Sequence, residues 1–236
     1  MAPPASAFPT TRWTLILGAR AGAAARRRAL EELLAIYWRP LYVYLRRRGV
    51  PAASAEDLVQ GFMIHLLESP EFLERLHPSR GHFRGYLKKA LDHYRANLYA
   101  REKALKRGGG LTLVPLDVAL AERELAAIPE AADGAYDREW AMQVMQRCVH
   151  RLGEEFAQGR RADRAPVVLR FFSLDEAPSY AESASECGMT VPQFKAALHR
   201  ARVRFRQLLR EEVADTVAAD VDVERELGEL MRALSA

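Results

Sequence analysis

The chain has 236 residues, of which 49% are hydrophobic and 28% are charged, a composition typical of a globular protein. No apolar run approaches the roughly 20 residues that a membrane-spanning helix needs, so we expect no membrane partner. The formal net charge is +4, but residues 211–236 contain eight acidic residues and two arginines, so the rest of the chain carries +10. This basic body favours a polyanionic partner, nucleic acid first, although a solvated basic surface without a partner stays open from charge alone.

The first residues and the cysteines indicate a cytoplasmic protein. Met1–Pro9 is uncharged and rich in proline and alanine, without the basic start and apolar stretch of a secretory signal. Cys148 and Cys187 are far apart and lack the spacing of metal ligands, which is typical of free thiols in a reducing compartment. We therefore expect a protein of the cytoplasm that holds neither a metal nor a cofactor.

Apolar residues recur at helical spacing along most of the chain, and strand patterns are nearly absent, so we predict an all-α fold. The first helical block covers Thr11–Arg48, where Pro40 is expected to break or kink the helix. A second helix is expected over Ser54–Glu68, and a third begins at Phe83 with one apolar face. The other face of this third helix is basic and carries Arg84, Lys88, Lys89, Arg95 and Arg101.

Three consecutive glycines, Gly108–Gly110, interrupt the helical pattern and begin a segment of weak periodicity. We interpret residues 108–136 as a flexible linker between two small helical domains. The first domain is expected over residues 10–107 and the second over residues 137–213. Residues 214–236 form an acidic tail, and because it follows an arginine-rich helix we hypothesise that it shields that helix in the free protein.

The second domain contains the pattern of a helix-turn-helix between Pro178 and Arg210. Ala184 allows two helices to approach, Gly188 permits a tight turn, and Thr190 is placed to cap the second helix. Apolar residues on both sides of the turn would hold the two helices together. Such a pair is typical of proteins that place the second helix in the major groove of DNA.

The second helix of this pair is expected to contact DNA through its exposed side. Residues 191–210 contain six lysines and arginines and no acidic residue. The start of the helix would reach base edges and its arginine-rich remainder would contact phosphates, with a steep salt dependence. The candidate residues are Thr190, Gln193, Lys195, Ala196, His199, Arg200, Arg202 and Arg204. A surface helical hairpin that is arginine-rich for unrelated reasons remains the alternative.

Three segments of the second domain resemble region four of bacterial sigma factors, especially the extracytoplasmic-function type. They are Ser179–Glu182, Gly188–Thr190 and His199–Arg206. The resemblance implies that the second domain binds the distal promoter element as duplex DNA. Two residues depart from the pattern: Ser183 stands where Ile or Leu is usual, and Pro192 lies in the first turn of the second helix.

The first half resembles region two of the same family. Glu56–Phe62 is similar to the helix that docks on the largest polymerase subunit, although Gly61 stands where many relatives have an acidic residue. Phe83–Leu87, followed by Asn97, is similar to the stretch that melts and reads the promoter near the start site. Further residues resemble a branch of the family that is common in planctomycetes and myxobacteria. These are Trp13, Tyr37, Trp38 and Lys106–Gly110.

The resemblance implies a sigma factor that binds core RNA polymerase and directs it to promoter DNA for transcription initiation. An anti-sigma factor is a further partner that it suggests, and no covalent chemistry is expected. The implied contacts with the proximal promoter element are Arg84, Lys88, Asn97, Tyr99 and Arg101. The implied polymerase contacts are Asp57, Gln60 and Phe62.

Three other classes of protein are alternatives to a sigma factor for this sequence. A stand-alone helix-turn-helix transcriptional regulator would use the same second domain without polymerase. A sigma relative that has lost DNA binding stays open because of Ser183 and Pro192. An enzyme is disfavoured because the sequence contains no His-Glu-x-x-His zinc motif, no Walker phosphate loop and no Gly-x-Ser-x-Gly nucleophile motif.

Overall fold

The computed structural model describes residues 23–68, 83–104, 131–158, 162–172, 178–217 and 220–235. Every regular element in these ranges is a helix, which confirms the all-α prediction. None of the helices described is long and apolar enough to cross a membrane. The expectations for Trp13, for the Lys106–Gly110 segment and for most of the linker lie outside the described residues.

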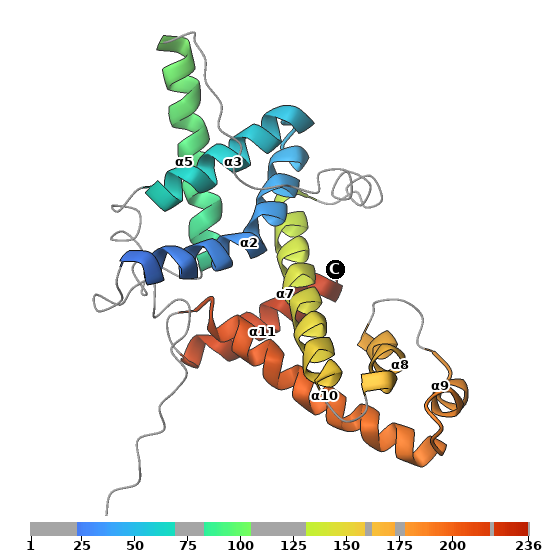
Figure 1. Cartoon of the computed structure of the whole chain (residues 1–236). Coiled ribbons are helices and arrows are strands. Elements are labelled where there is room, and N and C mark those ends of the chain that lie inside the picture. The colour runs from blue at the N-terminus through green and yellow to red at the C-terminus, as the bar shows by residue number, and fades with distance from the viewer. Residues whose placement is uncertain are drawn as a thin grey trace, which may run out of the picture. The chain divides into compact units, whose positions relative to one another are not determined.

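The described residues form eight α-helices and two short 3₁₀-helices (Figure 1). The elements of the first half are α2 (Ala23–Arg47), α3 (Ala52–Glu68) and α5 (Phe83–Ala104). Those that follow are α7 (Ala132–Ala157), η2 (Ala162–Arg164), α8 (Ala165–Leu169), η3 (Arg170–Phe172), α9 (Tyr180–Glu186), α10 (Val191–Ala214) and α11 (Asp220–Ser235).

The contacts divide the chain into two compact units. The first unit comprises residues 1–141 together with 214–236, and the second comprises residues 142–213. The acidic tail therefore belongs with the first half of the chain, where its residues form α11. Helix α7 begins at Ala132, inside the segment expected to be a linker.

Helix α2 continues through Pro40 to Arg47, so this proline does not break the helix, while the ribbon of α2 bends along its length, in line with the expected kink (Figure 1). Proline removes one backbone donor, and burial of the surrounding residues compensates: Leu41 is fully buried. The helix ends at Gly49, whose φ of 78° is accessible to glycine at little cost. The N–H of Val50 then donates to the carbonyl of Leu45 at 3.1 Å, which closes a Schellman turn.

The core of the first unit forms where α2, α3 and α5 pack together. Phe62 of α3 and Phe83 of α5 are almost fully buried, and the ring of Tyr37 in α2 meets that of Phe83 edge-on with 5.3 Å between centroids. Trp140, in the part of α7 that belongs to this unit, is also fully buried. Packing of these large side chains holds α5 in place, and this packing also sets the positions of its basic residues.

The second unit has its own apolar core between α8, α9 and α10. Phe194 and Leu198 of α10 pack with Val168 of α8 and Ala184 of α9 in one buried cluster. Cys187 also belongs to this cluster, and burial raises the pKa of its thiol. Because Phe194 and Leu198 point inward, the opposite side of α10 is left to solvent.

Candidate nucleic-acid interface

Helices α9 and α10 are joined by a tight turn at Gly188, which has a φ of 60°. The N–H of Met189 donates to the carbonyl of Ala184 at 2.9 Å, and that of Gly188 donates to Ser185 at 3.0 Å. These two bonds form a Schellman turn, which satisfies the last carbonyls of α9. The turn was expected at this glycine, and the geometry supplies the reason, since other residues are strained at positive φ.

The start of α10 is closed by a reciprocal capping box between Thr190 and Gln193. The backbone N–H of Gln193 donates to Thr190 Oγ1 at 3.4 Å, and that of Thr190 donates to Gln193 Oε1 at 3.0 Å. The prediction that Thr190 caps this helix is therefore confirmed. The side-chain oxygen of Gln193, a candidate for reading bases, serves the cap in this structure.

The structure accommodates both unusual residues of this region. Ser183 is 1% exposed beside Ala184, and its carbonyl accepts the N–H of Cys187 at 3.2 Å. Pro192 is the second residue of α10 and is exposed. A proline is tolerated there because the first N–H groups of a helix have no acceptor within the helix.

Four cations and a histidine form one stripe along the solvent side of α10, which we call the outer stripe. Its members are Lys195, His199, Arg202, Arg206 and Arg210, and all five are exposed. They recur at intervals of four, three, four and four residues, so they share one helix face. Arg206 and Arg210 were not among our candidate contacts, although continuing the same spacing would have found them.

The beginning of the outer stripe lies next to an aromatic residue of α9. Lys195 Nζ lies 5.3 Å from the centre of the Tyr180 ring, within the range of a cation–π contact. Tyr180 is 37% exposed, which is high for a large hydrophobic side chain. Ala196, another candidate, is exposed beside them at the start of α10. The start of α10 therefore carries a lysine next to the aromatic ring of Tyr180, with an exposed alanine beside the lysine in the sequence.

Arg200 and Arg204 lie on a different face of α10 from the outer stripe. Both line a cavity of about 310 Å³ in the second unit, together with Phe156 of α7 and Val168 of α8. Arg200 is exposed and stays a candidate for DNA contact. The two arginines nevertheless differ from the outer stripe in having apolar neighbours.

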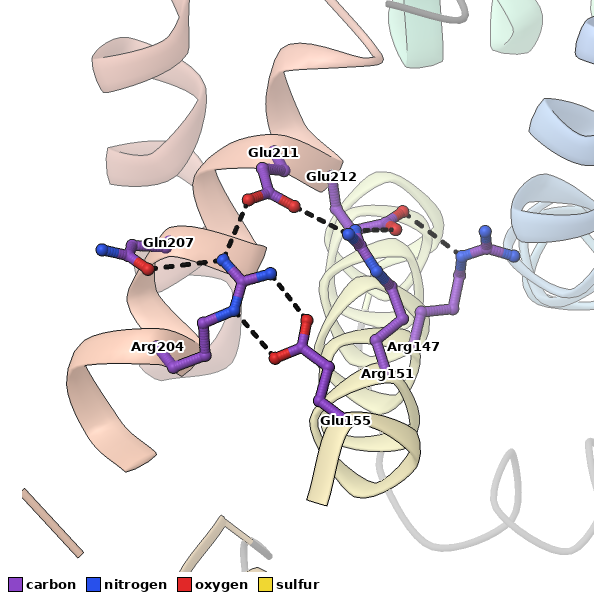
Figure 2. Close-up of polar contacts among 7 residues, drawn as sticks. All are labelled: Arg147, Arg151, Glu155, Arg204, Gln207, Glu211 and Glu212. Carbon is purple, nitrogen blue, oxygen red and sulfur yellow. Dashed lines mark hydrogen bonds and ion pairs between the residues drawn. The ribbon is translucent and has the colours of Figure 1, made fainter. Parts of the chain in front are cut away.

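Arg204 is held by carboxylates of the second unit (Figure 2). Its Nη2 and Nε donate to both oxygens of Glu155 at 2.6 and 2.8 Å, and its Nη1 donates to Glu211 at 3.1 Å. The hydrogen bonds to Glu155 and then to Glu211 raise the pKa of Arg204, and the bond from Arg204 lowers the pKa of Glu155. A guanidinium committed in this way is unsuited to a phosphate, so the expectation that Arg204 contacts DNA is corrected.

The ion pairs continue from Glu211 along α7 and α10, and we call the whole set the α7–α10 ladder. Arg151 donates to Glu211 at 2.7 Å and to Glu212 at 2.8 Å, and Arg147 donates to Glu212 at 3.3 Å (Figure 2). Glu212 is 1% exposed, so its charge is compensated by the two arginines. Cys148 is buried nearby, where burial and then the charge of Glu212 raise the pKa of its thiol to about 12.

Arg84, expected to contact the proximal promoter element, is buried in the first unit. It is 9% exposed, and its guanidinium lies 4.7 Å from the centre of the Trp140 ring. Its Nε donates to Glu226 at 2.8 Å, and its two terminal nitrogens donate to Asp137 and Glu229. In this arrangement Arg84 is enclosed by carboxylates, so it is not the freely available contact that the sequence predicts.

The remaining candidates on α5 are less enclosed. Lys88 is half-buried, donates to Asp133 at 2.8 Å and has its Nζ 5.7 Å from the Tyr136 ring centre. Asn97 is exposed. The side chains of Tyr99 and Arg101 lie outside the described residues. On this helix the structure leaves Asn97 as the described candidate that solvent reaches freely.

The candidates for polymerase contact on α3 also include both an exposed and a buried residue. Asp57 is exposed, whereas Phe62 is 1% exposed and packs against Tyr94 with 5.6 Å between ring centroids. Phe62 is therefore a core residue, which corrects its assignment to the interface. Gly61 also has a packing role, because a Cβ there would lie 2.8 Å from the Tyr94 hydroxyl oxygen.

Gln60 lies at a groove between α2 and α3. The groove has a volume of about 320 Å³ and is mostly apolar, with Trp38, Met63 and Leu67 among its lining residues. Gln60 donates to Glu56 at 3.3 Å and is half-buried. Trp38 and Met63 were not named as contacts from the sequence, because the groove depends on how two helices pack.

Comparisons with family models, with curated proteins and with solved structures find no match to this chain.

Proposed function

We propose that this chain is a sigma factor, which binds core RNA polymerase and directs it to specific promoters. The observation that carries the proposal is the outer stripe on α10, directly after the tight turn at Gly188. Helix α10 is capped at its start, and the tight turn joins it to α9. The cations of the stripe are exposed along one face of this helix. Helices presented in this way fit the major groove of DNA.

The dimensions of the outer stripe suit duplex DNA. From Lys195 to Arg210 the helix rises by roughly 22 Å, at about 1.5 Å per residue. Cations at its start lie where base edges would be read, and those farther along lie where phosphates would pass. Each phosphate that the stripe neutralises would contribute about −0.9 to the slope of log affinity against log salt concentration.

The polymerase half of the proposal depends on α3 and on the resemblance of Glu56–Phe62 to region two. Asp57 is exposed on this helix, and Gln60 borders the apolar groove with Trp38 and Met63. A groove that joins apolar residues to a polar rim is suited to a helix of a partner protein. A stand-alone regulator would need no such contact.

Run-off transcription with core polymerase tests the proposal. Templates are the protein's own upstream region and a promoter library, and a specific transcript is expected only when the protein is added. Arg202→Gln combined with Arg206→Gln should abolish that transcript, whereas Arg232→Gln, at an exposed position of α11, should leave it unchanged. Arg232 donates within its own helix to Gly228, so it is a matched loss of one exposed arginine.

Two results would contradict the proposal. The first is the absence of any specific transcript across the library, with protein that is folded by circular dichroism. The second is tight binding to one duplex sequence without any capture of core polymerase in a pull-down. The second result would identify a stand-alone helix-turn-helix regulator.

A further inference from the structure

The C-terminal helix α11 supplies carboxylates to a cation of α5, and both helices belong to the first unit. Glu226 of α11 accepts from Arg84 Nε at 2.8 Å, and Glu229 accepts from Arg84 Nη2. The side chain of Glu226 is 0% exposed and that of Glu229 is 27% exposed. Asp137 accepts from the remaining terminal nitrogen, Nη1, and Nη2 also donates to the second oxygen of Glu226 at 3.5 Å.

Four carboxylates pair with two cations of α5 in this cluster. Arg84 and its neighbour Lys88 are the two cations of α5 in it, and Asp133, Asp137, Glu226 and Glu229 are the four carboxylates. While α11 is bound, its carboxylates occupy the guanidinium of Arg84, and their charge repels an approaching phosphate backbone.

Helix α11 is attached through both apolar and ionic contacts. Val223, Glu226 and Leu230 are buried on one face of it, whereas Met231, beside that face, is 54% exposed. The ionic part of this attachment contributes little net stability, because desolvation of buried charges offsets most of their attraction. Another anion that satisfies Arg84 can therefore replace the ionic part of this attachment, whereas full release of α11 also gives up the burial of Val223 and Leu230.

We infer that α11 is an intramolecular competitor, which occupies Arg84 with carboxylates and must leave before α5 can bind single-stranded DNA. Phosphates of the DNA would then take the places of Glu226 and Glu229 on the guanidinium. Asn97, which is exposed on the same helix, would border the strand. This inference rests on the proposed function, because only that function calls for single-stranded DNA on α5.

The test measures binding of a fluorescein-labelled oligothymidine by fluorescence anisotropy at low salt, with the full-length protein. Glu229→Gln removes one competing charge and is expected to strengthen binding about two- to fivefold, the range of a partly exposed ion pair. The control is Asp222→Asn in the same helix, whose carboxylate is 28% exposed and pairs with Arg225. It changes the net charge equally and is expected to leave the affinity unchanged.

A third variant shows whether the gain acts through Arg84. In Glu229→Gln combined with Arg84→Gln, the increase should disappear. Equal affinities for Glu229→Gln and Asp222→Asn, with both proteins folded by circular dichroism, would overturn the inference. So would a gain in affinity that survives Arg84→Gln.

Hydrogen exchange of the wild-type protein provides a measurement that does not depend on variants folding. Saturating oligothymidine should accelerate amide exchange in residues 220–235, because the displaced helix loses its packing. Unchanged or slower exchange there would contradict displacement. Run-off transcription with the wild-type protein separates the two proposals, since a specific transcript without any release of α11 leaves the sigma function standing and removes only the competitor.

Discussion

The basic face of α5 and the outer stripe of α10 both consist of cations at helical spacing, yet different groups lie opposite them. Arg84 on α5 is 9% exposed and faces three carboxylates. Arg202 and Arg206 on α10 are exposed to solvent. Helical spacing thus predicts that a face is basic, but residues far away in the chain decide whether this face is available to a polyanion.

The largest difference between the two faces is expected in stability. Arg84→Gln leaves Glu226 buried without its cation, so we expect the free energy of unfolding to fall by about 3–5 kcal/mol. Arg202→Gln changes an exposed position and should alter it by less than about 0.5 kcal/mol. Urea unfolding at neutral pH measures both values. If Arg84→Gln proved as mild as Arg202→Gln, the contrast between a buried and an exposed basic face would be wrong.

The second expected effect is on DNA affinity. Arg202→Gln combined with Arg206→Gln removes two exposed cations, so the slope of log affinity against log salt should become shallower by about 1.8. Arg204→Gln should leave this slope unchanged, because Glu155 and Glu211 already hold that guanidinium. Titrations of duplex DNA over a range of salt concentrations measure the slopes. An equal change for Arg204→Gln would place Arg204 back among the phosphate contacts.

A smaller effect is expected from exchanging the partners in the α7–α10 ladder. Arg204 and Glu155 have side chains that are 36% and 40% exposed, so breaking their pair should cost about 1 kcal/mol or less. Arg204→Glu alone also places a new carboxylate beside those of Glu155 and Glu211, so it should lower the melting temperature. Adding Glu155→Arg should restore part of the loss. A double variant no more stable than Arg204→Glu would show that the pair does not connect α7 to α10.

The smallest effect is expected in the pH dependence of the same pair. The hydrogen bond from Arg204 lowers the pKa of Glu155. The contribution of this pair to stability is therefore fully present at a pH above the ordinary glutamate pKa of about 4.3. That contribution disappears as the pH falls through the lower pKa of the folded state. The difference in melting temperature between wild type and Glu155→Gln should therefore shrink at acidic pH. Glu182→Gln, at an exposed position in α9, serves as the control and should show no such trend.

The local features of α9 and α10 could be predicted from the sequence because their causes are local. Gly188 was expected at the turn, Thr190 at the helix cap and Phe194 in the core, each from its neighbours within a few residues. The structure has a φ of 60° at Gly188, a capping box at Thr190 and a buried Phe194. The all-α class follows from the same short-range periodicity.

The positions of Arg84 and Arg204 could not be predicted, because their partners are distant in the chain. Glu229 lies 145 residues from Arg84, and Glu155 lies 49 residues from Arg204. The local spacing places Arg204 on a different face from Arg202, but it does not show which carboxylates lie opposite that face. The acidic tail shows the same limit, since its residues Glu226 and Glu229 pair with Arg84, which lies 142 and 145 residues earlier in the chain.

The capping box at the start of α10 limits the precision with which one base pair can be read. A glutamine that recognises adenine uses its side-chain oxygen and nitrogen together. In Gln193 the oxygen accepts the N–H of Thr190, so reading adenine would open the cap at a cost of about 1 kcal/mol. That cost is comparable to the discrimination of about 1–3 kcal/mol that the contact provides. A binding motif selected from random DNA should therefore carry little information at the base pair opposite Gln193, and more at the positions opposite the outer stripe.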